Sequence, residues 1–338
     1  MRLLQVGLGS WGRRWAELVD ASPGFQLAGI IDPDPNSRAW AAETLALPLD
    51  AVYESFDGAL AHGAFDTVLV TTPPETHRAV TETALTAGCH VLVEKPLATS
   101  VADARAMAAA AERAERALMV SQNYRYTAMA RAMRATIAED RIGSVLAVRI
   151  AFRDTRQLFP RGNFRYSMRH PLVLDMAIHH FDLLRAITGR EPTSVDARSW
   201  RVPDSPYAHD PACAALITLT GDVTAVYDGD WAAHAPETSW NGDWEIIGTT
   251  GRLTWRGDAI TTQCWEEDPV AVPAANGPID GRLGVLAEFA RAIETGQPPE
   301  TGVHDNLNSL AVTLGCVASI EAGSPVAMER FSRDGTSS

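Results

Sequence analysis

The stretch RLLQVGLGSWG, residues 2–12, decides the class of fold. A short apolar run ends at Gly7, and a helical pattern starts near Trp11. Between them, Gly7, Gly9 and Gly12 follow the pattern G-x-G-x-x-G, in which the glycines allow a tight turn, close approach of backbone to a pyrophosphate, and close helix–strand contact. The helix start offers free N–H groups to phosphates. Because the pattern follows a strand and opens a helix, it predicts a dinucleotide-binding turn made by Gly7, Leu8, Gly9, Ser10, Trp11 and Gly12.

The first third of the chain alternates apolar runs with helical patterns. The expected strands are 2–6, 25–32, 66–74, 90–96 and 118–124, and the expected helices start near 11 and cover 36–45, 75–87 and 99–117. Strands without internal polar alternation, separated by helices, indicate a parallel sheet covered on both faces. We therefore expect an α/β fold with an N-terminal Rossmann domain, a doubly wound parallel sheet, over residues 1–122.

Asp32 bears on the cofactor. It ends the second expected strand, 20 residues beyond Gly12. A carboxylate there accepts hydrogen bonds from ribose hydroxyls and repels a 2′-phosphate, which predicts NAD in preference to NADP. Arg38 is close enough in sequence to favour a phosphate, but we interpret it as a solvated helix residue.

Two further stretches come at the ends of strands, where open α/β sheets bind ligands. TTPPETH covers residues 71–77, and EKP covers residues 94–96. Lys95 ends a buried strand just before Pro96, so it is a candidate site residue, and the proline allows a cis bond there. The alternative is a lysine whose ammonium extends past the sheet edge into water.

After Tyr124 the pattern changes. A helix is expected over 126–143 and strands over 144–155, 193–201, 212–220, 223–231, 243–248, 251–256 and 259–266, followed by helices 282–296 and 303–322 and a short strand near Val326. Short turns between successive strands indicate antiparallel pairing. We expect an α+β domain over 123–338 with a mostly antiparallel sheet, covered on one face by helices and on the other by a second subunit of a homo-dimer or homo-tetramer.

The stretch LVLDMAIHHFDLL, residues 172–184, reads as a buried helix interrupted by acids and histidines. On a helix of 3.6 residues per turn, Asp175, His179 and Asp182 share one stripe, which we expect to line a cleft. Oxidation of an alcohol needs a base for the hydroxyl proton, and histidine suits this role near neutral pH. We assign His179 as the base, Asp175 as its orienting partner or a hydroxyl acceptor, and Lys95 as the group that stabilises the developing alkoxide. The sequence leaves open an exchange of the Lys95 and His179 roles.

Other residues of the second part have two interpretations each. Asp175 and His179 could be a satisfied helix pair, and Asp182 is expected to be structural, paired with Arg185 or another arginine. His180 is either a packed core histidine or a pocket wall, and Trp231 and Trp240 are either core residues or a rim for a polyhydroxylated ligand. A loop rich in arginine and aromatic residues, 153–166, precedes the helix.

GLGSWG, TTPPETH, VLVEKP and LDMAIHHFD, in this order and spacing, resemble the Gfo/Idh/MocA family of oxidoreductases from Leu3 to about Val326. The resemblance implies a Rossmann domain, a C-terminal domain on an open, largely antiparallel sheet, and hydride transfer between a nicotinamide and a carbinol carbon of a sugar, inositol or polyol. It implies catalytic roles for Lys95, Asp175 and His179, and cofactor contacts by Thr71, Thr72, Pro73, His77, Glu94 and Lys95. Ala177 replaces a glycine that is common in the family, and His180 is not general there, which leaves the substrate open.

The bulk composition narrows the partners. A net charge of −13 argues against nucleic acid and against an anionic membrane surface. The four cysteines are far apart and form no C-x-x-C pair, as expected of core thiols in a reducing compartment. No apolar run reaches the ~20 residues of a membrane span, and the N-terminus shows no signal pattern, so we expect a cytoplasmic protein whose partner is a small polyhydroxylated substrate.

Two rival functions remain. Asp175, His179 and His180 are of the residue types that bind metals, but adjacent helix histidines point apart and no H-E-x-x-H motif is present, so we expect no metal. A non-catalytic nucleotide-sensing regulator on the same fold is the other alternative. The joint presence of Lys95, Asp175 and His179 favours the enzyme.

Overall fold

The computed structural model describes residues 1–338 except 46, 156–158, 161, 277–280 and 333–338. Two compact units divide the chain, Met1–Gln122 with Arg282–Leu307, and Asn123–Gly281 with Asn308–Ser338. The domains expected from the sequence, 1–122 and 123–338, are each one continuous segment. In the structure, residues 282–307 return to the first unit. Phe289 explains the return, because its ring stacks on that of Phe25 with centroids 6.0 Å apart.

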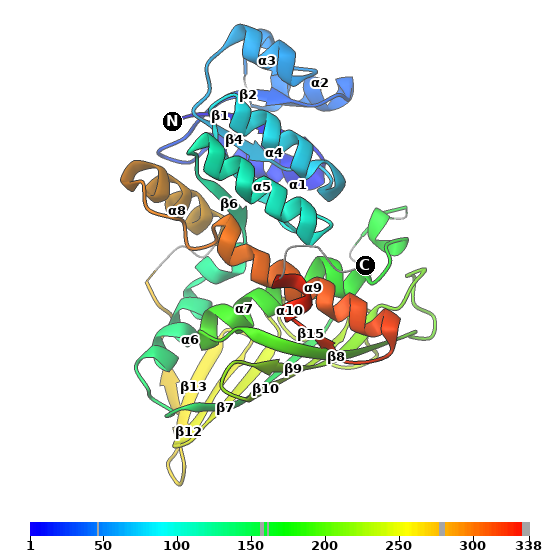
Figure 1. Ribbon diagram of the computed structural model, residues 1–338, viewed down its shortest axis with the longest axis vertical. Helices are drawn as coiled ribbons and strands as arrows, with labels where there is room; N and C mark the ends of the chain where they lie inside the picture. The colour runs from blue at the N-terminus through cyan, green and yellow to red at the C-terminus, as the bar shows by residue number, and fades with distance from the viewer. Residues whose placement is uncertain (46, 156–158, 161, 277–280, 333–338) are drawn as a thin grey trace. The chain divides into compact units, whose positions relative to one another are not determined.

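A six-stranded sheet forms the centre of the first unit (Figure 1). Its strands are β1 (Arg2–Val6), β2 (Gln26–Ile31), β3 (Val52–Tyr53), β4 (Thr67–Val70), β5 (His90–Glu94) and β6 (Leu118–Ser121). The order is β3-β2-β1-β4-β5-β6 and each neighbouring pair is parallel. This order is that of the doubly wound dinucleotide-binding sheet, and the expected fold class is confirmed. The order reverses between β1 and β4, so their carboxyl ends flank the place where such sheets bind ligands.

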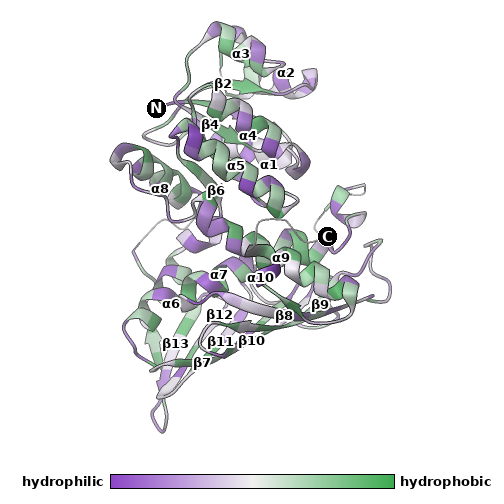
Figure 2. Ribbon diagram, viewed as in Figure 1, coloured by the Kyte–Doolittle hydropathy of each residue, from purple (hydrophilic) through white to green (hydrophobic). Residues whose placement is uncertain are grey.

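Helices of the first unit begin at side-chain caps in two cases. The helices are α1 (Ser10–Asp20), α2 (Pro35–Thr44), α3 (Phe56–His62), α4 (His77–Thr86), α5 (Val101–Ala114) and α8 (Gly281–Thr295). The Asp34 carboxylate accepts from the backbone N–H groups of Asn36 and Ser37, and Ser100 caps α5 in the same way. Hydrophilic and hydrophobic segments both occur along α4 and α5 (Figure 2), as expected of helices that cover a sheet.

The sequence patterns did not predict β3 or α3. The strand has two residues and the helix seven, which is too short for either periodicity to stand out.

The second unit is built on a nine-stranded sheet. Its strands are β7 (Val145–Arg153), β8 (Pro192–Trp200), β9 (Ala212–Leu219), β10 (Val223–Asp230), β11 (Asp243–Gly248), β12 (Gly251–Arg256), β13 (Ala259–Cys264), β14 (Val270–Val272) and β15 (Val326–Ala327). The order is β14-β13-β12-β11-β7-β10-β9-β8-β15. The β7–β10 pair is parallel and the other pairs are antiparallel, which confirms the mostly antiparallel sheet.

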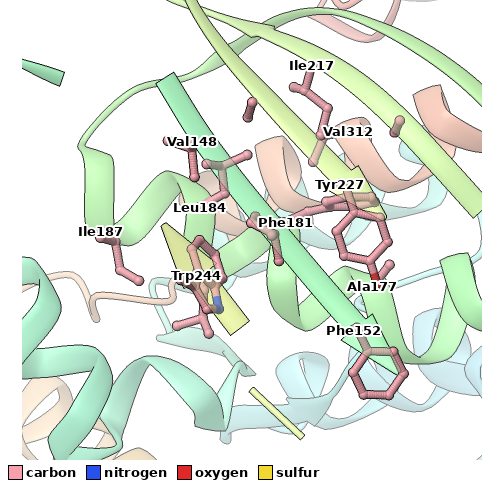
Figure 3. Close-up of a cluster of buried hydrophobic side chains, with 14 of the residues drawn as sticks. Val148, Phe152, Ala177, Phe181, Leu184, Ile187, Ile217, Tyr227, Trp244 and Val312 are labelled. Atoms are coloured by element: carbon pink, nitrogen blue, oxygen red, sulfur yellow. The ribbon is translucent and has the colours of Figure 1, made fainter. Parts of the chain in front are cut away.

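Helices cover one face of this sheet. They are α6 (Ala128–Ala138), α7 (Ile178–Thr188) and the later part of α9 (Val303–Ala322), with the short α10 (Glu329–Ser332) after β15 (Figure 1). Between helix and sheet lies a core that includes Val148, Phe152, Phe181, Leu184, Ile217, Tyr227, Trp244 and Val312 (Figure 3). Among the described residues, no helix has the length and apolar character that crossing a membrane requires.

The opposite face of the sheet carries two large exposed apolar side chains at neighbouring positions. Leu216 of β9 pairs with Val226 of β10, and the two side chains are 50% and 42% exposed. Large apolar side chains grouped on a surface are typical of an interaction site.

Candidate functional site

The glycine turn after β1 leaves open space for a ligand at one point only. Gly7 has φ +99°, and a Cβ at Gly12 would lie 2.4 Å from the Gly7 carbonyl oxygen, so neither position accepts a side chain. A Cβ at Gly9 would meet nothing within 4 Å. Gly9 is also the N-cap of α1 and offers no side chain to the free N–H groups of the helix start. The turn therefore fits a pyrophosphate that approaches the backbone at Gly9.

Side chains from two strands hold this turn in place. The Gln5 amide donates to the carbonyl oxygen of Gly12 over 2.7 Å, and the Thr71 hydroxyl donates to that of Gly7 over 2.8 Å. Thr71 follows β4, so the turn is fixed against the neighbouring strand across the switch point. Its hydroxyl braces the turn from within the protein.

Asp32 lies at the end of β2, next to the glycine turn. One carboxylate oxygen accepts from the Leu8 N–H over 2.6 Å, and the other accepts from the Asp34 N–H over 2.9 Å. Arg38 differs from its interpretation as a solvated residue. It is half-buried, and its guanidinium donates to the carbonyl oxygens of Asp32 and Pro33 over 2.8 and 2.9 Å.

Glu94 is held by two tryptophans of α1. One carboxylate oxygen accepts from the indole N–H groups of Trp15, over 2.6 Å, and Trp11, over 2.9 Å. The other oxygen accepts from the Lys95 backbone N–H over 3.0 Å. Lys95 itself is half-buried, and the Lys95–Pro96 peptide bond is cis. Trp15 carries no functional signal in the sequence, because its helical position alone suggests a core residue.

His77 joins the two strand-end segments. One ring nitrogen lies 2.9 Å from the Thr72 carbonyl oxygen, and the other lies 2.9 Å from that of Pro96. The ring is 1% exposed, and burial lowers the pKa of His77 even though both carbonyls favour its charged form. The structure thus places His77 as a brace between the segment that holds Thr72 and Pro73 and the segment that holds Lys95.

In the second unit, the helix with the acids and histidines is not α-helical throughout. Residues Leu172–Ala177 form a π-helix, and α7 begins at Ile178. The 3.6-residue period behind the predicted stripe therefore does not hold at Asp175, because hydrogen bonds from i to i+5 give a π turn more residues than that. Apolar residues fill both sides of Asp175, so the sequence pattern gives no sign of the wider turn. Single π turns inside helices occur frequently at functional sites.

Asp175 is paired with an arginine of the preceding loop. The Arg165 guanidinium donates to its carboxylate over 2.5 Å and lies over the rings of Phe159 and Phe164, 4.6 Å from each centroid. The loop was predicted as rich in arginine and aromatic residues, but nothing in its sequence singled out Arg165. Two further arginines of that loop, at positions 156 and 161, lie outside the described residues.

His179 is buried under a tyrosine. The rings of His179 and Tyr124 stack with centroids 4.1 Å apart and planes 10° apart, and His179 is 6% exposed. Burial raises the pKa of the Tyr124 phenol, which therefore stays protonated. Nothing in the sequence links Tyr124 to His179, because 55 positions separate them along the chain.

His180 and Asp182 are structural. His180 is fully buried, its Nε2 lies 3.0 Å from the Trp240 carbonyl and its Nδ1 lies 3.1 Å from the Tyr227 hydroxyl. A carbonyl only accepts, so Nε2 carries the proton and Nδ1 accepts from the tyrosine, which satisfies a neutral imidazole. Asp182 accepts from Arg125 at both oxygens, over 2.6 and 2.7 Å. The expectation of an arginine partner for Asp182 is confirmed, and the main partner is Arg125 rather than Arg185, which lies 4.0 Å away.

The described part of the chain contains no group of three or more His, Cys, Asp and Glu side chains placed to hold a metal ion.

The sheet order, the glycine turn and Asp32 define a dinucleotide-binding protein of the Rossmann class. Residues 1–122 match the profile of the oxidoreductase family with an NAD-binding Rossmann fold, and residues 130–254 match the Gfo/Idh/MocA C-terminal domain. The chain belongs to the Gfo/Idh/MocA family and is an oxidoreductase.

Three similar proteins illustrate the family. A 1,5-anhydro-D-fructose reductase of Ensifer adhaerens is 31% identical over 78% of this chain and 80% of its own length. A D-apiose dehydrogenase of Paraburkholderia graminis is 27% identical over 96% of this chain and 88% of its own. The crystal structure of an oxidoreductase from Agrobacterium radiobacter in complex with NAD+, L-tartaric acid and magnesium has a TM-score of 0.90 at 22% identity, covering 98% of this chain and 99% of that one. At that identity the structure shows the fold alone.

The buried His180 predicts a pH dependence of stability. Burial lowers the pKa of His180 to about 4, whereas an unfolded histidine titrates near ~6.5. As pH falls, the histidine of the unfolded state therefore binds a proton before that of the folded state. The free energy of unfolding decreases between about pH 6.5 and pH 4, by about 3 kcal/mol in total. Thermal unfolding followed from pH 7 to pH 4 should show a shallower fall in Tm for His180→Gln than for the wild type. The exposed His62 is the control, since His62→Gln should keep the wild-type slope, and equal slopes for His180→Gln and wild type would contradict the assignment.

Proposed function

We propose that this oxidoreductase exchanges hydride between nicotinamide dinucleotide and a carbinol carbon of a sugar, inositol or related polyol. The observation that carries the proposal is the combination, in one chain, of the glycine turn beside Asp32 with the Asp175 and His179 helix. The named relatives that act on an anhydro-sugar and on apiose support this substrate class. They favour the enzyme over the nucleotide-sensing regulator.

The first unit supplies the cofactor contacts of the proposal. Bound nicotinamide accepts or donates the hydride. The backbone at Gly9 and Ser10 binds the pyrophosphate, and Asp32 accepts from the ribose hydroxyls with the lone pairs that Leu8 and Asp34 leave available. A 2′-phosphate would meet the charge of the same carboxylate, so we propose NAD in preference to NADP. We propose the remaining contacts at Gly7, Leu8, Trp11, Gly12, Thr72, Pro73 and Lys95, with Thr71, His77 and Glu94 acting mainly by holding these segments in place.

Three side chains act on the substrate. We assign His179 as the acceptor of the hydroxyl proton and Lys95 as the cation that stabilises the developing negative charge on that oxygen. Asp175, oriented by Arg165, accepts a hydrogen bond from a substrate hydroxyl. Stacking on Tyr124 fixes the plane of the His179 ring.

We also propose that the enzyme is a cytoplasmic homo-oligomer. Cys89, Cys213, Cys264 and Cys316 are all free thiols, and the fold brings the sulfurs of Cys213 and Cys316, far apart in sequence, to 3.9 Å without a disulfide, which supports a reducing compartment. The exposed Leu216 and Val226 on the open sheet face support a second copy as its partner. Arg149, in register with Val226, donates to Glu245 over 2.7 Å, so its charge is already paired on this face.

A charge placed in this face tests the oligomer. Val226→Arg should convert a wild-type dimer or tetramer to monomers in sedimentation velocity, because an unpaired charge would be buried at the interface. Leu60, 41% exposed on α3, provides the matched control, and Leu60→Arg should leave the assembly intact. A monomeric wild type, or an unchanged assembly in Val226→Arg, would exclude this face.

The catalytic assignment is tested by turnover and cofactor binding together. Lys95→Ala and His179→Ala should each lower kcat by about 10²–10⁴-fold against a panel of sugars and inositols read as NADH absorbance, with NAD affinity nearly unchanged. Lys95→Arg keeps the positive charge, so its kcat separates charge stabilisation from proton transfer. Near-normal turnover in either alanine variant would refute the role of that residue. The exposed His62 serves as control, and His62→Ala should behave as wild type.

Cofactor choice is tested at Asp32. Asp32→Ala should weaken NAD binding by about tenfold, because the variant loses hydrogen bonds to the ribose. The affinity for NADP relative to that for NAD should rise, because the charge that repels a 2′-phosphate is lost as well. Fluorescence titration with both reduced cofactors measures each affinity. An unchanged NAD to NADP ratio would refute the role of Asp32.

A further inference from the structure

The second unit contains a cavity of about 190 Å³ that the proposed chemistry leaves unused. Its wall comes from residues 203–207 and 231–234, with Thr155 and Tyr166. Tyr207, Trp231 and Ala233 are buried and form the inner part, while Asp204 and His234 are exposed and mark the mouth. A cavity of this size has room for one small ring.

Aromatic rings form a continuous inner wall. Tyr207 and Trp231 stack with centroids 5.8 Å apart, and Tyr166 meets Tyr207 edge to face at 5.3 Å. Such a wall offers apolar ring faces together with polar tips. A sugar ring has the complementary character, with C–H groups on its faces and hydroxyls at its rim. Burial raises the pKa of the Tyr207 phenol, which therefore remains a donor at neutral pH.

The polar groups of the wall favour a neutral ligand. The indole N–H of Trp231 is buried and has no hydrogen-bond partner among the described residues, and a ligand hydroxyl is an acceptor for it. Thr155 and Ser205 add hydroxyl groups. None of the described residues of the wall is an arginine or a lysine, so a phosphorylated ligand would lack the partners that proteins commonly use for phosphate there.

The cavity adjoins the residue that we assign to a substrate hydroxyl. Tyr166 follows Arg165 in the chain, and Arg165 donates to Asp175 over 2.5 Å. The negative charge of Asp175 is also among the causes that raise the pKa of Tyr207, whose ring meets that of Tyr166. A group attached to a sugar bound at Asp175 can thus reach the cavity.

We propose that the cavity is a second-ring subsite, which binds a neutral polyhydroxylated ring joined to the ring that carries the reacting hydroxyl. The preferred substrates are then disaccharides or glycosides rather than free monosaccharides. The inference rests on the proposed function, because it names the substrate class of the same site. Tyr207 and Trp231 are the residues that determine this specificity.

Paired substrates and a filled cavity test the proposal. The paired substrates are cellobiose with glucose, xylobiose with xylose, and lactose with galactose. In at least one pair, the wild-type enzyme should show a kcat/KM for the disaccharide that is at least about tenfold higher than for the monosaccharide. Ala232 lines the cavity, and Ala232→Phe should remove that preference while leaving monosaccharide turnover within about twofold. Ala235, exposed in the same loop and absent from the wall, is the matched control, and Ala235→Phe should keep both rates. Equal kcat/KM for all three pairs in the wild type, or equal losses for both sugars of a pair in Ala232→Phe, would overturn the subsite.

Calorimetry separates failure of the subsite from failure of the proposed function. Binding of the three disaccharides to wild type, Ala232→Phe and the milder Tyr207→Phe is measured with and without NAD, so the readout does not need turnover. If the enzyme turns over none of the sugars, the proposed function is refuted. The subsite is still supported in that case if the wild type binds a disaccharide and Ala232→Phe abolishes the binding. Absence of disaccharide binding to wild type, or binding that neither variant weakens, overturns it. Circular dichroism and Tm confirm that Ala232→Phe is folded, and if it is not, Tyr207→Phe carries the comparison.

Discussion

The ion pair between Arg125 and Asp182 is the interaction on which the second unit depends. Two hydrogen bonds join the side chains, which are 5% and 1% exposed, and the Ser309 hydroxyl donates to the same carboxylate over 2.6 Å. Removing one partner of such a pair leaves a buried charge and costs about 3–5 kcal/mol, a large share of the ~5–15 kcal/mol that stabilises a typical domain. The pair also organises the candidate site. Asp182 lies one helical turn after His179, and Arg125 follows Tyr124, so one interaction fixes both rings of the stack.

The same constraint sorts the polar residues of the helix by role. Buried polar groups need partners inside the protein, and His180 has Tyr227 and Trp240 while Arg185 has Glu191 and Ser309. Through these contacts, His180, Asp182 and Arg185 hold α7 in place. Asp175 differs because it lies in the π turn and its carboxylate is 13% exposed, so it remains open to a ligand. The wider turn thus separates a residue that can meet substrate from neighbours that stabilise the unit.

The sequence was sufficient where the signal is local and periodic. The parallel strands and the glycine turn follow from apolar runs and glycine spacing, and the structure reproduces both within a few residues. Contacts between distant positions were not predictable. The fold alone brings together the partners of three contacts. These are the hydrogen bonds of Trp15 with Glu94 and of Arg165 with Asp175, and the stacking of Tyr124 on His179. The π turn was missed for a different reason, since residues apolar on every side of Asp175 are compatible with several helical periods.

One compositional fact connects the sequence with the chemistry. The chain contains 28 arginines and a single lysine, Lys95, among 338 residues. Arginine makes the described surface ion pairs, such as Arg78 with Glu82, and also the buried pair with Asp182. Positive charge in this protein is therefore supplied by guanidinium groups, and position 95 is the exception. A guanidinium stays charged at any physiological pH, whereas an ammonium is compact and can release its proton. A lysine confined to this one position supports the proposed role of Lys95, in which a cation more compact than a guanidinium stabilises the charge on a reacting oxygen.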